Sequence, residues 1–254
     1  KNTRNRQGSI QRRIFKMIGE KHCSGYAEYE ALEKKRIEIN LKHAEAGVRF
    51  IDIKTVYIDE DVKIGAGTVI YPCVVIEGKT EIGKTCIIGQ NTKIVNSSIG
   101  DNTKIESSYI LESRVGNYTS VGPFAYIRPG STVGDDCKVG DFVEVKNSSF
   151  GNRSKASHLT YIGDSDLGEE VNLGCGVIFV NYDGSKKYRS TVEDGAFIGC
   201  NSNLVSPVKV GKKAYVAAGS TVIKDVPDGA LYIERGDPFM QNGWVEKKGI
   251  LKKK

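Results

Sequence analysis

The sequence is dominated by an aliphatic residue that recurs every six positions. The residues with this spacing form three runs: Ile58, Ile64, Ile70, Ile76, Ile82, Ile88 and Ile94; Val115, Val121, Ile127, Val133, Val139 and Val145; and Val192, Ile198, Leu204, Val210, Val216 and Val222. A period of six fits neither the 3.6-residue turn of an α-helix nor the two-residue alternation of a half-buried strand. It is typical of a parallel β-helix, in which each hexapeptide forms one short strand and one turn.

Three hexapeptides close one triangular coil, so each aliphatic side chain should point inward and stack on its equivalent one coil later. Every coil then satisfies its backbone through the coils on either side, and only the two terminal edges need covering. Glycine often follows the aliphatic residue, as at Gly65, Gly83 and Gly134, and we expect it there because sharp corners can require a positive φ. A β-sandwich with irregular turns would not hold the six-residue spacing. The sequence therefore predicts an all-β fold, a parallel β-helix of hexapeptide repeats.

The repeat is absent from both ends of the chain. Residues 29–46 mix aliphatic and charged side chains in helical spacing, and Gly47 can stop a helix there. After residue 229 the repeat gives way to an extended arm and a lysine-rich tail. We expect three parts, namely a helical linker segment at 1–49, the β-helix at 50–228, and a C-terminal arm and basic tail at 229–254.

The net charge of +6 is concentrated at the two ends of the chain. Residues 1–21 and 246–254 are strongly basic, whereas the body between them has a net charge of −4. A nucleic-acid-binding protein would carry its basic stripe on the folded domain, so we predict no nucleic-acid partner. The sequence has no apolar run long enough for a membrane span and no signal peptide. Its six cysteines lack C-x-x-C spacing and indicate reduced thiols, which predicts a cytoplasmic protein.

The repeat is most disturbed between Phe179 and Val192. The gap is thirteen residues, where twelve would keep the register, and no aliphatic residue occupies its middle position. The gap contains the turn signal Asp183-Gly184, which predicts a loop that leaves the coil and returns. A tolerated surface insertion is one interpretation, and a functional loop is the other, because function is often carried by such insertions.

Three residues in the repeat suggest chemistry. Arg128 and Lys146 are eighteen residues apart, so they should project from the same face of successive coils. Two stacked cations repel unless an anion joins them, which predicts a phosphate ligand. His158 is the one histidine in the coil region, and beside the cations and the loop we interpret it as a base. A zinc site of three converging histidines is excluded, and no metal is predicted.

Four motifs resemble the acetyltransferase half of a bacterial bifunctional enzyme, glucosamine-1-phosphate N-acetyltransferase / N-acetylglucosamine-1-phosphate uridyltransferase. They are Arg128-Pro129-Gly130, the GDFVEVKN run at 140–147, the SKASHLTYIGD run at 154–164, and Asn181-Tyr182-Asp183-Gly184. The resemblance extends from about Ala31 to Trp244. It implies a left-handed parallel β-helix that forms a homotrimer with active sites between subunits. The implied reaction is acetyl transfer from acetyl-coenzyme A to the amine of glucosamine-1-phosphate, for UDP-N-acetylglucosamine and cell-wall precursor synthesis.

The chain contains no counterpart of the uridyltransferase half. It begins at Lys1 without methionine, so we expect a fragment or an incomplete chain. The role of residues 1–28 is not indicated by the resemblance.

The resemblance also implies roles for single residues. His158 matches the general base, and Glu144 lies in the motif beside it. The residues expected to bind the sugar phosphate are Arg128, Lys146, Tyr161, Asn172 and Lys187. Those expected at acetyl-coenzyme A are Cys175, Asn181, Tyr182, Cys200, Ala218 and Arg235.

Two of the expected acetyl-coenzyme A contacts depart from the family in side chain. Cys175 replaces the usual alanine, and Cys200 replaces the usual serine. In the family, the backbone makes part or all of the contact at these two positions. Both residues can therefore still bind acetyl-coenzyme A. A ping-pong route through a Cys175 thiolate is an alternative to direct attack by the amine, and we favour direct attack because relatives manage with alanine.

Two other functions stay open from the sequence. A hexapeptide-repeat acetyltransferase for another amino-sugar acceptor would share the fold, but one for an unphosphorylated acceptor would not need the set of Arg128, Lys146 and Lys187. A non-catalytic β-helix scaffold would not need the cations, His158 and the loop together.

Overall fold

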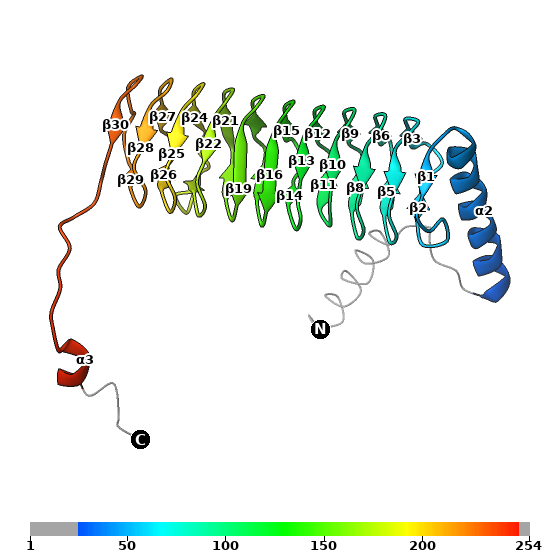
Figure 1. Cartoon of the computed structure of the whole chain (residues 1–254), viewed down its shortest axis with the longest axis horizontal. Coiled ribbons are helices and arrows are strands. Elements are labelled where there is room, and N and C mark those ends of the chain that lie inside the picture. The colour runs from blue at the N-terminus through cyan, green and yellow to red at the C-terminus, as the bar shows by residue number, and fades with distance from the viewer. Residues whose placement is uncertain (1–24, 249–254) are drawn as a thin grey trace, which may run out of the picture.

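The computed structural model describes residues 25–248, and its body is a rod of stacked coils (Figure 1). All strand pairs are parallel, and each coil except those at the C-terminal end contributes one strand to each of three faces. The first face contains β1 (Arg49–Phe50), β4 (Val69–Ile70), β7 (Ile87–Ile88), β10 (Lys104–Ile105), β13 (Ser120–Val121), β16 (Lys138–Asp141), β19 (Lys155–His158), β22 (Asn172–Leu173), β25 (Phe197–Ile198), β28 (Tyr215–Val216) and β30 (Leu231–Tyr232).

The other two faces are built in the same way. The second face contains β2 (Tyr57–Ile58), β5 (Val75–Glu77), β8 (Lys93–Val95), β11 (Tyr109–Leu111), β14 (Tyr126–Ile127), β17 (Glu144–Lys146), β20 (Tyr161–Gly163), β23 (Ile178–Val180), β26 (Asn203–Val205) and β29 (Thr221–Val222). The third face contains β3 (Lys63–Ile64), β6 (Glu81–Ile82), β9 (Ser98–Ile99), β12 (Arg114–Val115), β15 (Thr132–Val133), β18 (Ser149–Phe150), β21 (Ser165–Leu167), β24 (Ser190–Val192) and β27 (Lys209–Val210). This architecture confirms the predicted left-handed parallel β-helix.

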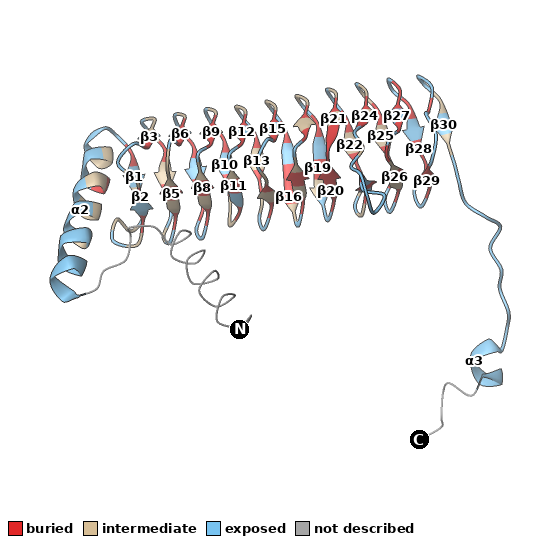
Figure 2. Cartoon of the chain, turned by 180° about the vertical axis from the view of Figure 1, so that it is seen from behind, coloured by how far each residue is buried: buried red, intermediate tan, exposed pale blue. Residues whose placement is uncertain are grey.

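The core is a set of ladders made by the repeated aliphatic residues. On the first face Ile70, Ile88, Ile105, Val121 and Val139 are strand partners in that order, and each is at most 2% exposed. Figure 2 shows that buried positions recur from coil to coil along the rod. Each such side chain stabilises the fold by roughly 1.5–3 kcal/mol relative to exposure, so the rod is stabilised along its whole length.

The glycines that follow the aliphatic residues have a different cause from the one expected. Positive φ values at the corners belong mainly to residues with side chains, such as Asn91 at 58° and Asp136 at 55°. Gly83 and Gly134 are not in this conformation. A Cβ on Gly83 would lie 2.3 Å from the Asp101 Oδ1 of the next coil. These glycines are therefore needed for close approach between coils, and the expectation of positive φ was wrong for them.

Gly151 offers a test of this close approach. An added Cβ would lie 2.2 Å from the carbonyl oxygen of Gly168, a backbone atom that cannot move alone. We expect Gly151→Ala to lower the free energy of unfolding by about 1–3 kcal/mol through overpacking, measured as a fall in Tm. Gly236→Ala is the matched control, because no heavy atom lies within 4 Å of its Cβ position. Equal Tm values for the two variants would contradict the explanation.

Helix α2 (Tyr26–Glu45) covers the first coil (Figure 1). It ends in a Schellman arrangement, with Gly47 at a φ of 94° and its N–H donating to the Ala44 carbonyl, as the sequence predicted for this glycine. The buried Asn40 amide donates to the carbonyls of Ile53 and Val56, at 3.0 Å each. The helix thus satisfies backbone groups that the first coil would otherwise leave open.

The C-terminal arm leaves the last coil after β30 and carries the short helix α3 (Trp244–Lys247) (Figure 1). Its Phe239 and Met240 are 88% and 85% exposed. Strand β30 pairs with β28, so strand pairing extends to Tyr232. The division of the chain into parts at 1–49, 50–228 and 229–254 stays a prediction. No helix within residues 25–248 is both long enough and apolar enough to cross a bilayer.

Candidate active site

Arg128 and Lys146 project from equivalent positions of successive coils, as the eighteen-residue spacing predicted, because Ile127 and Val145 are strand partners. Each cation has its own carboxylate, however. Arg128 Nη1 lies 2.6 Å from Glu144 Oε1, and Lys146 Nζ lies 2.8 Å from Asp164 Oδ2. The argument that stacked cations require an external anion was therefore wrong, because it overlooked these two partners.

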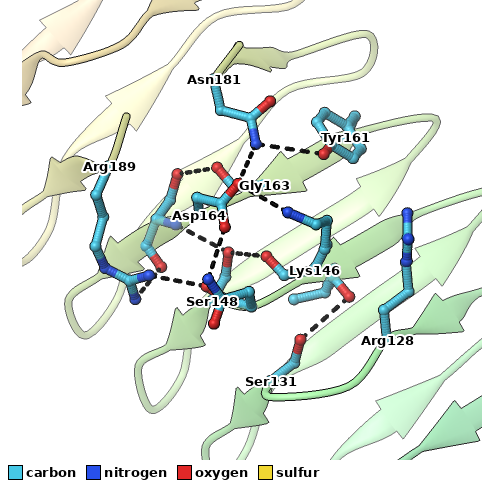
Figure 3. Close-up of polar contacts among 12 residues, drawn as sticks. Arg128, Ser131, Lys146, Ser148, Tyr161, Gly163, Asp164, Asn181 and Arg189 are labelled. Atoms are coloured by element: carbon cyan, nitrogen blue, oxygen red, sulfur yellow. Dashed lines mark hydrogen bonds and ion pairs between the residues drawn. The ribbon is translucent and has the colours of Figure 1, made fainter. Parts of the chain in front are cut away.

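Asp164 is the centre of a buried polar cluster (Figure 3). It is 7% exposed and accepts hydrogen bonds from Lys146 Nζ, from Asn147 Nδ2 at 2.6 Å and from Asn181 Nδ2 at 2.5 Å. Burial alone would raise the pKa of Asp164, but these donors outweigh it and hold the pKa below its usual range. Burial alone would lower the pKa of Lys146, but the hydrogen bond and charge attraction to Asp164, together with Lys187 and Tyr161, raise it. Both groups are therefore charged near neutral pH.

Tyr161 joins the same cluster, because Gly163 has no side chain to block its ring. The Tyr161 hydroxyl is 3.5 Å from Asn181 Nδ2, and a Cβ on Gly163 would lie only 2.5 Å from that hydroxyl. The glycine therefore leaves the space in which the ring lies. We call Lys146, Asn147, Tyr161, Asp164 and Asn181 the Asp164 cluster.

The predicted loop is a short hairpin that begins beside the Asp164 cluster. Tyr182 and Lys187 form an isolated antiparallel bridge, and the Asp183 carboxylate accepts the N–H groups of Ser185 and Lys186 at 2.7 and 2.6 Å. These hydrogen bonds lower the pKa of Asp183. The hairpin holds Tyr182 and Lys187 opposite each other with both side chains exposed.

A second group of residues runs along the corner between the first and second faces. Asp141 and His158 are strand partners, and the following strand registers carry the same position to the next three coils. We call Asp141, His158, Cys175, Cys200 and Ala218 the corner column. It brings together four predicted site residues that span sixty positions of the sequence.

His158 Nδ1 lies 2.6 Å from Asp141 Oδ1. An ionised carboxylate can only accept, so this contact places a proton on Nδ1 and leaves Nε2 as the nitrogen that can receive another. The hydrogen bond to His158 is the main reason why the pKa of Asp141 lies below its usual range. The histidine side chain is 55% exposed, so a substrate can reach it.

Sequence reasoning did not assign Asp141 a role. The signal was present, because Asp141 lies in the GDFVEVKN run one coil of seventeen residues before His158. The repeat shortens from eighteen to seventeen at this point, which hides the pairing from a search at fixed spacing.

The chain is similar to several known proteins. Residues 52–148 match the family model described as the GMPPB C-terminal domain, and residues 190–224 match a hexapeptide repeat of succinyl-transferase. The bifunctional protein GlmU of Clostridioides difficile (strain 630) is 56% identical over 219 residues, which are 86% of this chain and 48% of that protein. GlmU of Clostridium beijerinckii is 48% identical over 245 residues, which are 96% of this chain and 53% of that protein. This chain is similar to the C-terminal half of GlmU.

The chain spans about half the length of the curated GlmU relatives it matches. Solved structures share its fold at low identity. A UDP-N-acetylglucosamine acyltransferase from Francisella novicida has a TM-score of 0.52 at 20% identity, covering 70% of this chain and 65% of that one. The Arabidopsis UDP-N-acetylglucosamine acyltransferase has a TM-score of 0.50 at 18% identity, covering 74% and 66%.

The remaining predicted site residues lie beside the Asp164 cluster and the corner column. Asn172 is half-buried on β22, as the strand partner of Lys155 on the first face. Arg235 is in the C-terminal arm, with its Cδ 3.8 Å from the Cβ position of Gly219, so it lies beside the end of the corner column. Within residues 25–248, no group of three or more His, Cys, Asp and Glu side chains is arranged to hold a metal ion.

Proposed function

We propose that the chain transfers the acetyl group of acetyl-coenzyme A to the amine of glucosamine-1-phosphate, giving N-acetylglucosamine-1-phosphate. The observation that carries the proposal is the Asp141–His158 pair. In this pair His158 is a base whose Nε2 is accessible. His158 also lies three residues before Tyr161 of the Asp164 cluster. The chain is about half identical in sequence to GlmU over most of its length, which supports the substrate assignment. We infer from the resemblance that the enzyme works as a homotrimer in the cytoplasm.

The proposed reaction needs one base and no covalent enzyme intermediate. The neutral amine attacks the thioester carbonyl, a C–N bond forms, and the C–S bond breaks. His158 Nε2 takes the proton of the amine and can return it to the departing thiolate. Asp141 stabilises the imidazolium that forms between these events. The N–H of Gly176 already donates to the Leu159 carbonyl at 2.9 Å, so an oxyanion donor must come from elsewhere near Cys175.

Arg128 and Lys146 would bind the sugar phosphate as cations already held in place. Their carboxylate partners Glu144 and Asp164 keep the side chains ordered before substrate binds, which reduces the loss of side-chain freedom on binding. Lys187, exposed on the hairpin, would supply a third charge.

Arg128→Ala should weaken transition-state binding of glucosamine-1-phosphate by roughly 10- to 150-fold, the equivalent of a charged hydrogen bond of about 1.5–3 kcal/mol. The KM for acetyl-coenzyme A should hardly change. Steady-state kinetics with each substrate varied in turn measures both effects, with Lys63→Ala, which removes another surface ion pair, as the control. Equal losses for the two substrates would mean that Arg128 is structural.

Asp141→Asn should lower kcat by at least about tenfold while the fold is kept. The amide can still contact the ring, but it cannot stabilise the charged imidazolium. An unchanged kcat would reject the positioning role.

The test of the function itself is acetyl transfer with three acceptors. Glucosamine-1-phosphate should be acetylated in preference to glucosamine and glucosamine-6-phosphate. Preference for another amino sugar would support the alternative acceptor, and no transfer to any acceptor would support the scaffold.

A further inference from the structure

Cys175 and Cys200 are neighbours on the corner column although 25 positions separate them in the sequence. Leu173 and Ile198 are strand partners just before them. Just after them, the N–H of Asn201 donates to the Cys175 carbonyl at 2.8 Å. The register is therefore fixed on both sides, and the two cysteines occupy the same position of successive coils.

The two thiols differ from the buried cysteines. Cys175 and Cys200 are exposed and free, so a reagent can reach both. The Cys86 and Cys137 thiols are buried, each lies 3.1 Å from a backbone carbonyl oxygen, and burial raises their pKa. The corner pair is thus the accessible pair of adjacent thiols in the described part of the chain.

The coil spacing suits a bond between these two residues. Adjacent parallel strands lie about 4.7–4.9 Å apart, and disulfides join residues whose Cα atoms are about 4.4–6.8 Å apart. His158 occupies the preceding position of the same column. An imidazole one coil away can accept the proton of a thiol, and the thiolate is the form that reacts.

We propose that Cys175 and Cys200 form an oxidisable dithiol that a low-molecular-weight disulfide, such as oxidised glutathione, closes to an intramolecular disulfide. The thiolate of one cysteine attacks a glutathione sulfur and releases one glutathione thiolate. The second cysteine then attacks the mixed disulfide and releases the other. Two electrons pass from the cysteines to glutathione, and the two cysteine protons end on the two glutathione thiols.

The position of the pair gives this modification a consequence. A disulfide there would lie directly between His158 and Ala218, where the acetyl donor is expected to bind. This part of the inference rests on the proposed function. Closure should then stop acetyl transfer, and reduction should restore it.

The experiment treats the whole chain with oxidised glutathione and maps its peptides by mass spectrometry without reduction. We expect a Cys175–Cys200 cross-linked peptide and a protein lighter by two hydrogen atoms. Cys73→Ser is the matched control, because Cys73 is exposed but its counterpart one coil later is Asn91, and this variant should still close. Cys175→Ser and Cys200→Ser should each give only a mixed disulfide. Glutathione adducts without the cross-link in wild type, or a cross-link between two chains, would overturn the proposal.

An activity assay separates this inference from the proposed function. Loss of acetyl transfer on closure, recovered with dithiothreitol, supports the regulatory consequence, and unaltered activity of the closed form overturns it. If the untreated chain transfers no acetyl group at all, the proposed function fails. The peptide map still shows whether Cys175 and Cys200 form a disulfide, because it requires no substrate.

Discussion

Replacing His158 by alanine is expected to lower kcat by roughly 10²- to 10⁴-fold, the usual contribution of a positioned base. Thermal stability should change little, because the exposed ring makes its one described side-chain hydrogen bond to Asp141. Rapid kinetics at saturating substrates and a thermal melt of the same sample measure the two quantities.

A double variant makes this prediction sharper. If Asp141 acts only through His158, Asp141→Asn should cost nothing further in a His158→Ala background, because residues that act as a unit are not additive. A further loss in the double variant would give Asp141 an independent role. Turnover near the wild-type level in His158→Ala would reject His158 as the base.

The largest effect on stability is expected at Asp164. Asp164→Ala leaves Lys146 as a charge without its buried partner, which typically costs about 3–5 kcal/mol, and it also frees Asn147 and Asn181. We expect a lower free energy of unfolding in denaturant titrations and a loss of acetyl transfer. Glu81→Ala removes half of an exposed ion pair and is the control, with almost no change expected. Equal stabilities for both variants would show that the cluster contributes nothing.

The same residue predicts a pH dependence. Hydrogen bonding holds the folded-state pKa of Asp164 below its usual range, and its unfolded value is near ~3.9. The contribution of Asp164 to stability is therefore complete above the unfolded value and is lost as the pH falls through the lowered folded-state pKa. Acid titration of unfolding should show this loss in the wild type and not in Asp164→Ala.

The fold could be predicted from the sequence because each inward residue repeats at a spacing that only a stacked coil explains. The helix end at Gly47 was also predictable, since a local residue type determines it. The ion pairs of Arg128 and Lys146 were harder to find. Glu144 lies sixteen residues from Arg128, and Asp164 lies eighteen from Lys146, so only one of the two follows the main repeat.

The corner column shows why the rest of the site could not be read from spacing alone. Its steps are seventeen residues from Asp141 to His158, seventeen to Cys175, and twenty-five to Cys200, because the hairpin is inserted in the last interval. No fixed period finds residues whose separation changes along the column. The backbone pairing restores a constant spatial step that the sequence numbering conceals.

Because the step is constant, distances along the rod can be counted in coils. Four steps of about 4.8 Å separate Asp141 from Ala218, so the column measures about 19 Å along the axis. Under the proposed function, a donor held near Arg235 lies extended along this axis, so that its reactive carbon reaches His158. Inserting one whole coil between these residues would lengthen the column by one step of about 4.8 Å. Under the proposed function, the accepted donor length should therefore change in whole coils.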